Sequence, residues 1–176
     1  MMKDYDFTLK FNLQDPQSDP GEYVEKLYAG GYDDALIGVG LKGCISLNFI
    51  REASSAYEAI SSAISDVKAV VPSATLIEAA PDFVGLTDAA KILGCSRQNM
   101  RNLIVNSEQQ SPIPVYGGTP SMWHLGEILR WLRVVKRYSI DDSLLEVAET
   151  TMNLNIARSY QKIDPSIQKN IKSLVC

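Results

Sequence analysis

Apolar and polar residues alternate at the start of the chain, and short apolar runs follow, separated by glycine and proline. Every second residue from Phe7 to Leu13 is apolar, which is the period of a half-buried β-strand over residues 5–13. Apolar runs bounded by turn residues predict three more strands, at residues 35–39, 44–50 and 74–79. Because only a glycine-rich turn separates the second strand from the third, we expect these two to form an antiparallel hairpin.

Two helical patterns lie between these strands. Residues 20–29 begin at a proline and are followed by two glycines, which predicts a short helix. A longer helix is predicted from a cap at Ser54 or Ser55 to about Val71. The residues expected on its inward face are Tyr57, Ile60, Ile64 and Val67. The resulting order, β-α-β-β-α-β over residues 1–82, predicts an α+β domain of the ferredoxin-like kind.

Residues 86–105 predict two short helices joined by a tight turn. Thr87 is expected to cap the first helix, Gly94 to end it in a left-handed conformation, and Ser96 to cap the second. The second helix turns Met100, Leu103 and Ile104 inward, at helical spacing. Its outward residues are all polar: Arg97, Gln98, Arg101 and Asn102.

These four side chains are of the types that read DNA bases. Arginine donates to the O6 and N7 atoms of guanine, and glutamine or asparagine pairs with adenine in the major groove. The first turns of a recognition helix are where such side chains reach the base edges. The alternative is an ordinary helical hairpin with a solvated polar face.

A hairpin and a third helix are predicted after this pair. Residues 112–123 predict two short strands around Gly117 and Gly118, and residues 124–137 predict a helix. The apolar face of that helix is expected to consist of Ile128, Trp131, Leu132 and Val135, and its basic face of Arg130, Arg133, Lys136 and Arg137.

Residues 84–132 resemble the winged helix-turn-helix of MerR-like and excisionase (AlpA-like) DNA-binding proteins. The resemblance is carried by Leu86-Thr87-Asp88-Ala89-Ala90-Lys91-Ile92-Leu93-Gly94-Cys95-Ser96-Arg97-Gln98, by the proline-bounded hairpin and by Trp123-His124-Leu125-Gly126-Glu127-Ile128-Leu129-Arg130-Trp131-Leu132. It implies a dimeric regulator that reads double-stranded DNA with its second helix and places its wing on the backbone. The residues then expected at bases are Arg97, Gln98, Arg101 and Asn102, and those expected at the backbone are Ser96, Tyr116, Thr119, Arg130, Arg133, Lys136 and Arg137.

Charge is distributed unevenly along the chain, whose net charge is −4. Residues 1–82 contain 6 Lys or Arg and 13 Asp or Glu, whereas residues 83–139 contain 7 and 3. Residues 140–176 contain 4 and 5. The segment with the two short helices is therefore the only basic one, as phosphate attraction requires.

The tail, residues 140–176, predicts two amphipathic helices. The first begins near Asp141 with Leu144, Leu145, Ala148, Thr151 and Met152 on one face, and the second begins at Asp164-Pro165 with Ile167, Ile171, Leu174 and Val175. Short helices of this kind must bury their apolar faces, either on the same chain or in a homodimer. A homodimer could form through the exposed face or edge of the N-terminal sheet or through the tail, and we expect the tail.

Other chemistry is weakly supported. Residues 38–43 match the G-x-G-x-x-G pattern of dinucleotide sites, but a strand rather than a helix is predicted after them, so a hairpin turn is expected. Asp33 and Asp34 are similarly expected in a solvated turn. The three cysteines are widely spaced and the chain has one histidine, which predicts reduced thiols, no metal site, no cofactor and no catalytic residues.

The predicted protein is therefore a DNA-binding transcriptional regulator and not an enzyme. Without an apolar run of membrane-spanning length or the apolar core of a secretion signal, we expect it in the cytoplasm and away from the membrane. An alternative function uses the same helices to bind protein, as an adaptor in a mobile-element or defence locus.

Overall fold

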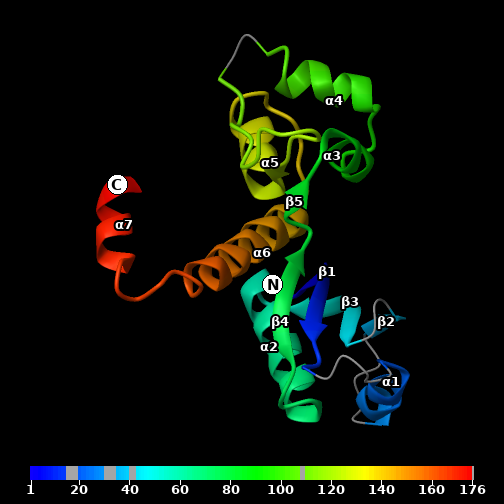
Figure 1. The fold of residues 1–176 in the computed structure, drawn as a ribbon. Helices are drawn as coiled ribbons and strands as arrows, with labels where there is room; N and C mark the ends of the chain where they lie inside the picture. The colour runs from blue at the N-terminus through cyan, green and yellow to red at the C-terminus, as the bar shows by residue number, and fades with distance from the viewer. Residues whose placement is uncertain (15–19, 30–34, 40–42, 108–109, 176) are drawn as a thin grey trace.

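The computed structural model of the chain describes residues 1–14, 20–29, 35–39, 43–107 and 110–175, and it shows a mixed α+β protein (Figure 1). The predicted acidic pair Asp33-Asp34, residues 40–42 of the G-x-G-x-x-G turn and Cys176 lie outside the described residues. The strands on either side of that turn are present, as predicted.

The N-terminal half contains an antiparallel sheet of four strands. They are β1 (Lys3–Asn12), β2 (Ala35–Val39), β3 (Cys44–Ala53) and β4 (Thr75–Ala80), in the order β2-β3-β1-β4. The predicted β2–β3 hairpin is confirmed. The alternation in β1 is confirmed too, because Phe7, Leu9 and Phe11 are buried while their neighbours face away. Phe7 lies opposite Phe49 of β3, and their rings stack with centroids 5.3 Å apart.

Two helices cover this sheet, α1 (Pro20–Ala29) and α2 (Ala56–Val70). The α2 cap is Ser55, whose hydroxyl accepts the Glu58 amide at 3.2 Å. The inward face of α2 differs from the prediction at Tyr57, which is exposed. The buried positions of α2 are taken mainly by alanines, which let the helix approach the sheet closely: Ala56, Ala59, Ile60, Ala63 and Val67.

The C-terminal half has a second core. Its elements are β5 (Phe83–Val84), α3 (Leu86–Ile92), α4 (Arg97–Ile104), β6 (Trp123–His124), α5 (Leu125–Val134), α6 (Asp142–Tyr160) and α7 (Gln168–Val175). β5 pairs with β6, so the chain enters and leaves the α3–α4 segment at adjacent points. In the described ranges, no helix is long and apolar enough to cross a membrane.

Helix α6 joins the two cores (Figure 1). Val147 packs into the sheet core, whereas Leu145 and Ala148 are buried against the second core. A Cβ on Gly126 of α5 would lie 3.3 Å from the Ala148 carbonyl oxygen, so glycine allows α5 and α6 to approach closely. The prediction that this face of the tail forms a dimer interface is therefore wrong for α6, because its own chain covers the face.

An ionic contact also fixes α6 to the sheet. Glu146 accepts hydrogen bonds from Lys3 Nζ at 2.9 Å and from the Tyr5 hydroxyl at 2.7 Å. Both hydrogen bonds hold the pKa of the Glu146 carboxyl below its usual value, and the bond from Lys3 has the larger effect. Burial and the same contact raise the pKa of Tyr5, so it remains a donor.

Candidate nucleic-acid interface

The turn between α3 and α4 is held by glycine and serine. Gly94 has a φ of 64°, the predicted left-handed conformation, and the next amide, that of Cys95, donates to the Ala90 carbonyl at 2.9 Å. The Ser96 hydroxyl accepts the Asn99 amide at 3.1 Å, so the predicted cap of α4 is confirmed. The predicted cap of α3 is wrong. The chain passes directly from β5 into the helix, so Gly85 occupies the cap position and Thr87 lies exposed in the first turn.

The two faces of α4 are separated as predicted. Met100 and Ile104 are buried in the second core, and Leu103 packs partly against it. The four polar residues of the outward face are exposed: Arg97, Gln98, Arg101 and Asn102. Gln98 donates through Nε2 to Asn102 Oδ1 at 3.2 Å, so the two side-chain amides, one helical turn apart, lie next to each other on the same face of α4.

A groove of about 410 Å³ runs beside this outward face. The Arg97 and Arg101 side chains line it from α4, and Thr119 lines it from the loop that follows Gly118. Neither arginine forms an ion pair with a described residue. Asp88 of α3 also lines the groove and is its single carboxylate among the described residues. The groove therefore places two free guanidinium groups opposite a hydroxyl-bearing loop.

The loop that follows α4 contains less β-structure than predicted. Two hydrogen bonds between Tyr116 and Met122 form an isolated bridge around Gly117 and Gly118, instead of two strands. Pro112 and Pro114 lack the amide hydrogens that a longer ladder needs. Tyr116 is exposed, and its ring lies where a side chain on Gly118 would stand, 2.2 Å from a Cβ built there.

The basic face of α5 differs from the prediction in length and in partners. The helix ends at Val134, because the chain reverses at Arg137 with a φ of 59°. Val135 is 40% exposed rather than part of the apolar face. Lys136 lies over the Trp131 ring, 5.3 Å from its centroid.

Two of the arginines on that face are paired with α6. Arg130 Nη2 lies 2.7 Å from Glu149 Oε1, and Arg133 Nη2 lies 2.6 Å from Asp142 Oδ1. These are contacts within the chain. They direct both guanidinium groups to the tail, whereas Arg137 is exposed without such a partner among the described residues.

The sequence did not predict a buried polar cluster where the two halves meet. His124 Nδ1 lies 2.6 Å from Asp82 Oδ1, and Asn155 Nδ2 donates to Asp82 Oδ2 at 2.8 Å. Thr151 donates its hydroxyl to the Pro81 carbonyl at 2.7 Å. Polar residues at positions 151 and 155 of an otherwise apolar helical face are the signal that could have revealed this cluster.

No arrangement of metal ligands exists in the described ranges, where no three His, Cys, Asp or Glu side chains form such a group. Cys44 and Cys95 are free thiols. No protein-family model, curated protein or solved structure matches the chain.

Proposed function

We propose that this chain is a winged helix-turn-helix protein of the MerR-like or excisionase type, which binds double-stranded DNA through α4 and regulates transcription. The observation that carries the proposal is the pair Arg97 and Arg101. They stand one helical turn apart, both exposed, both without an ion pair among the described residues, and both on the wall of one groove. Free guanidinium groups so placed are suited to phosphates and to guanine edges.

The outward face of α4 supports sequence reading as well as attraction. Because Gln98 donates one amide hydrogen to Asn102, its oxygen and second hydrogen remain for an adenine edge. We assign base reading to Arg97, Gln98, Arg101 and Asn102. The sequence that wild type binds most tightly can be selected from a pool of random duplexes. Gln98→Ala is expected to weaken binding to that selected sequence by about 1–3 kcal/mol and to leave the affinity for random DNA nearly unchanged.

The backbone contacts form a smaller set than the sequence predicts. The Ser96 oxygen caps α4, but its hydroxyl hydrogen is free to donate to a phosphate. Tyr116 and Thr119 are exposed on the loop, and Lys136 and Arg137 follow α5. Arg130 and Arg133 are excluded from our proposed contact surface because α6 holds them.

The remaining parts of the chain have roles consistent with a regulator. We propose that the acidic N-terminal half is a ferredoxin-like domain that does not touch DNA, since its charge repels phosphate. We propose a cytoplasmic location, no cofactor and no catalytic activity.

The test is fluorescence anisotropy with a labelled random duplex, at about 50 mM and about 200 mM salt. The expected result is binding that weakens steeply at the higher salt. Arg97→Ala with Arg101→Ala is expected to weaken binding strongly, whereas the control Lys26→Ala with Lys68→Ala removes the same charge from α1 and α2 and changes little.

Two results would contradict the proposal. One is absence of binding at the lower salt concentration, which would favour the adaptor function. The other is an equal loss in the α4 variant and its control, which would mean that net charge, rather than this groove, attracts the DNA.

A further inference from the structure

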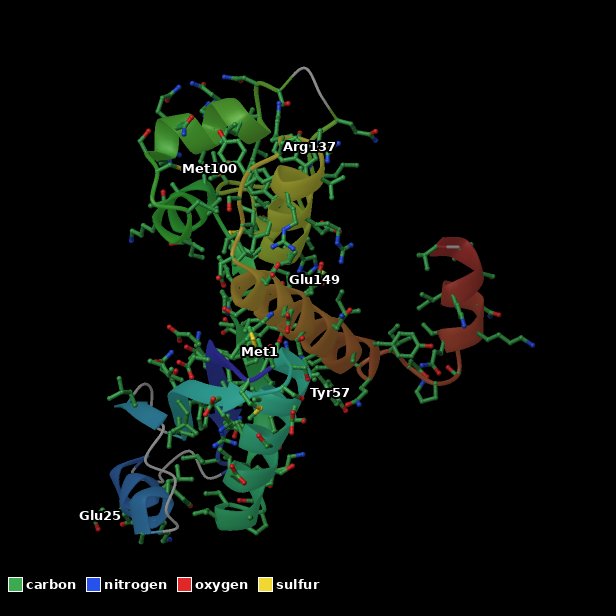
Figure 2. The ribbon with its side chains drawn as sticks, turned by 180° about the vertical axis from the view of Figure 1, so that it is seen from behind. Met1, Glu25, Tyr57, Met100, Arg137 and Glu149 are labelled. Atoms are coloured by element: carbon green, nitrogen blue, oxygen red, sulfur yellow. The ribbon has the colours of Figure 1, made fainter. Side chains whose placement is uncertain are left out.

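Helix α7 presents an apolar face that its own chain does not cover. Ile167, Ile171, Leu174 and Val175 fall at the spacing of one helical face, yet none of the residues of α7 is buried. Leu174 and Val175 are 82% and 79% exposed. Both views show the helix standing apart from the rest of the ribbon (Figures 1 and 2).

A second uncovered apolar surface lies where the two halves of the chain meet. We call it the junction patch, and it consists of Phe83, Val115, Ile156, Tyr160 and Ile163, which line a hollow of about 370 Å³. Each of the first four is between 45% and 52% exposed. An adjoining hollow, which shares Val115 and His124 with the first, extends the apolar surface to Ile113. Exposed apolar side chains gathered in this way are suited to contact with another protein surface.

The connection between α6 and α7 directs α7 away from the junction patch of its own chain. The Lys162 amide donates to the Ser159 carbonyl at 3.1 Å, and the Ile163 amide to the Tyr160 carbonyl at 3.1 Å. The Asp164 carboxylate then accepts a hydrogen bond from the Ser166 amide at 2.8 Å, and the Asp164 backbone carbonyl accepts one from the Ile167 amide at 3.1 Å. These hydrogen bonds hold the turn in a conformation in which α7 stands apart from the rest of the chain (Figure 1).

We infer that two copies of this chain exchange α7, each helix packing into the junction patch of the other copy. A two-fold arrangement makes both contacts at once, because every chain supplies one helix and one patch. A stable interface buries about 800 Å² on each partner. One helix of 8 residues supplies only part of such an interface, and the two-fold exchange doubles the contact because each side then buries a helix and a patch.

The charges beside the two surfaces agree with this pairing. α7 contains Lys169 and Lys172 and no acidic residue. Glu127, on the edge of the adjoining hollow, is exposed and forms no ion pair with a described residue. Arg130 lines the same hollow, but its charge is paired with Glu149 at 2.7 Å. The exchange therefore brings a basic helix to a free carboxylate.

Light scattering of the full chain tests the inference, and it does not depend on DNA binding. The wild type is expected to be a dimer of 19.4 kDa chains. Leu174→Asp with Val175→Asp in α7, and separately Ile156→Asp with Tyr160→Asp in the patch, are each expected to give monomers. The control, Leu36→Asp with Ile50→Asp, changes two exposed apolar residues of the sheet and is expected to remain dimeric.

Mixing the two monomeric variants separates exchange from other kinds of dimer. The patch of the α7 variant and the helix of the patch variant are both intact, so the mixture is expected to form a heterodimer through one contact. Because that contact is half of the wild-type interface, the heterodimer is expected to be weaker than the wild-type dimer and to be measured at a higher protein concentration. Thermal melting shows whether each variant is folded, and α7 variants are not expected to affect folding because they change no buried residue. A monomeric wild type, a dimer that survives in either variant, or a mixture with no heterodimer at the higher protein concentration would each overturn the inference.

Discussion

Asn155 of α6 pairs with both backbone groups of Ala79 at the outer edge of β4. Its Oδ1 accepts the Ala79 amide at 3.0 Å, and its Nδ2 donates to the Ala79 carbonyl at 2.7 Å. The side-chain amide thus takes the place of a neighbouring strand at the edge of the sheet. The same Nδ2 reaches Asp82, so one residue connects the sheet, α6 and the buried cluster that contains His124.

Replacing Asn155 is expected to destabilise the chain. Asn155→Ala leaves the Ala79 backbone groups and one Asp82 oxygen buried without these partners, at a cost of about 3 kcal/mol in the free energy of unfolding. The control, Asn153→Ala, removes an exposed amide from the same helix and is expected to change little. Urea unfolding of both variants measures the difference, and equal midpoints would contradict the structural role of the cluster.

The contact of Glu146 with Lys3 and Tyr5 predicts a dependence of stability on pH. Because the folded state lowers the pKa of Glu146, the contact stabilises the fold above the usual carboxyl pKa of 4.5. That stabilisation is lost as the pH falls through the lowered value.

We therefore expect Glu146→Gln to melt at a lower temperature than wild type at pH 7, with the difference disappearing in acid. Glu52→Gln changes an exposed carboxylate on β3 and provides the control. A melting difference that persists at low pH would show that the variant acts through packing rather than through the charge.

Gly94 and Gly117 provide a matched pair for the turn between α3 and α4. Both have open space around a built Cβ, but only Gly94 has a positive φ. Gly94→Ala is therefore expected to cost about 1 kcal/mol in stability, through backbone strain alone. Gly117→Ala is expected to be neutral in urea unfolding, and a loss as large as that of Gly94→Ala would contradict this explanation.

Local chemistry explains which parts of the fold were predictable from the sequence. The alternation of β1, the serine caps of α2 and α4, and the left-handed Gly94 each depend on a few neighbouring residues. The division of α4 into a buried and a polar face also follows from its own spacing.

The features that the sequence did not predict depend on distant contacts. Tyr57 matches an inward helical position, but alanines fill the close contact between α2 and the sheet. Arg130 and Arg133 match a free basic face, but the next helix, α6, supplies their partners 19 and 9 residues further along the chain. The apolar face of α6 is buried against the two cores of its own chain. Periodicity alone cannot distinguish such a face from one that forms a dimer interface.

The salt dependence of DNA binding by single-arginine variants tests the central claim most directly. Arg101 faces the groove without an ion pair among the described residues, whereas Arg130 is held by Glu149, so the two variants remove the same charge from different environments. The logarithm of the binding constant is plotted against the logarithm of the salt concentration for wild type, Arg101→Ala and Arg130→Ala. We expect Arg101→Ala to reduce the slope by about 1 and Arg130→Ala to leave it unchanged. A slope that Arg101→Ala does not alter, or that Arg130→Ala reduces as much, would contradict DNA binding through the groove beside α4.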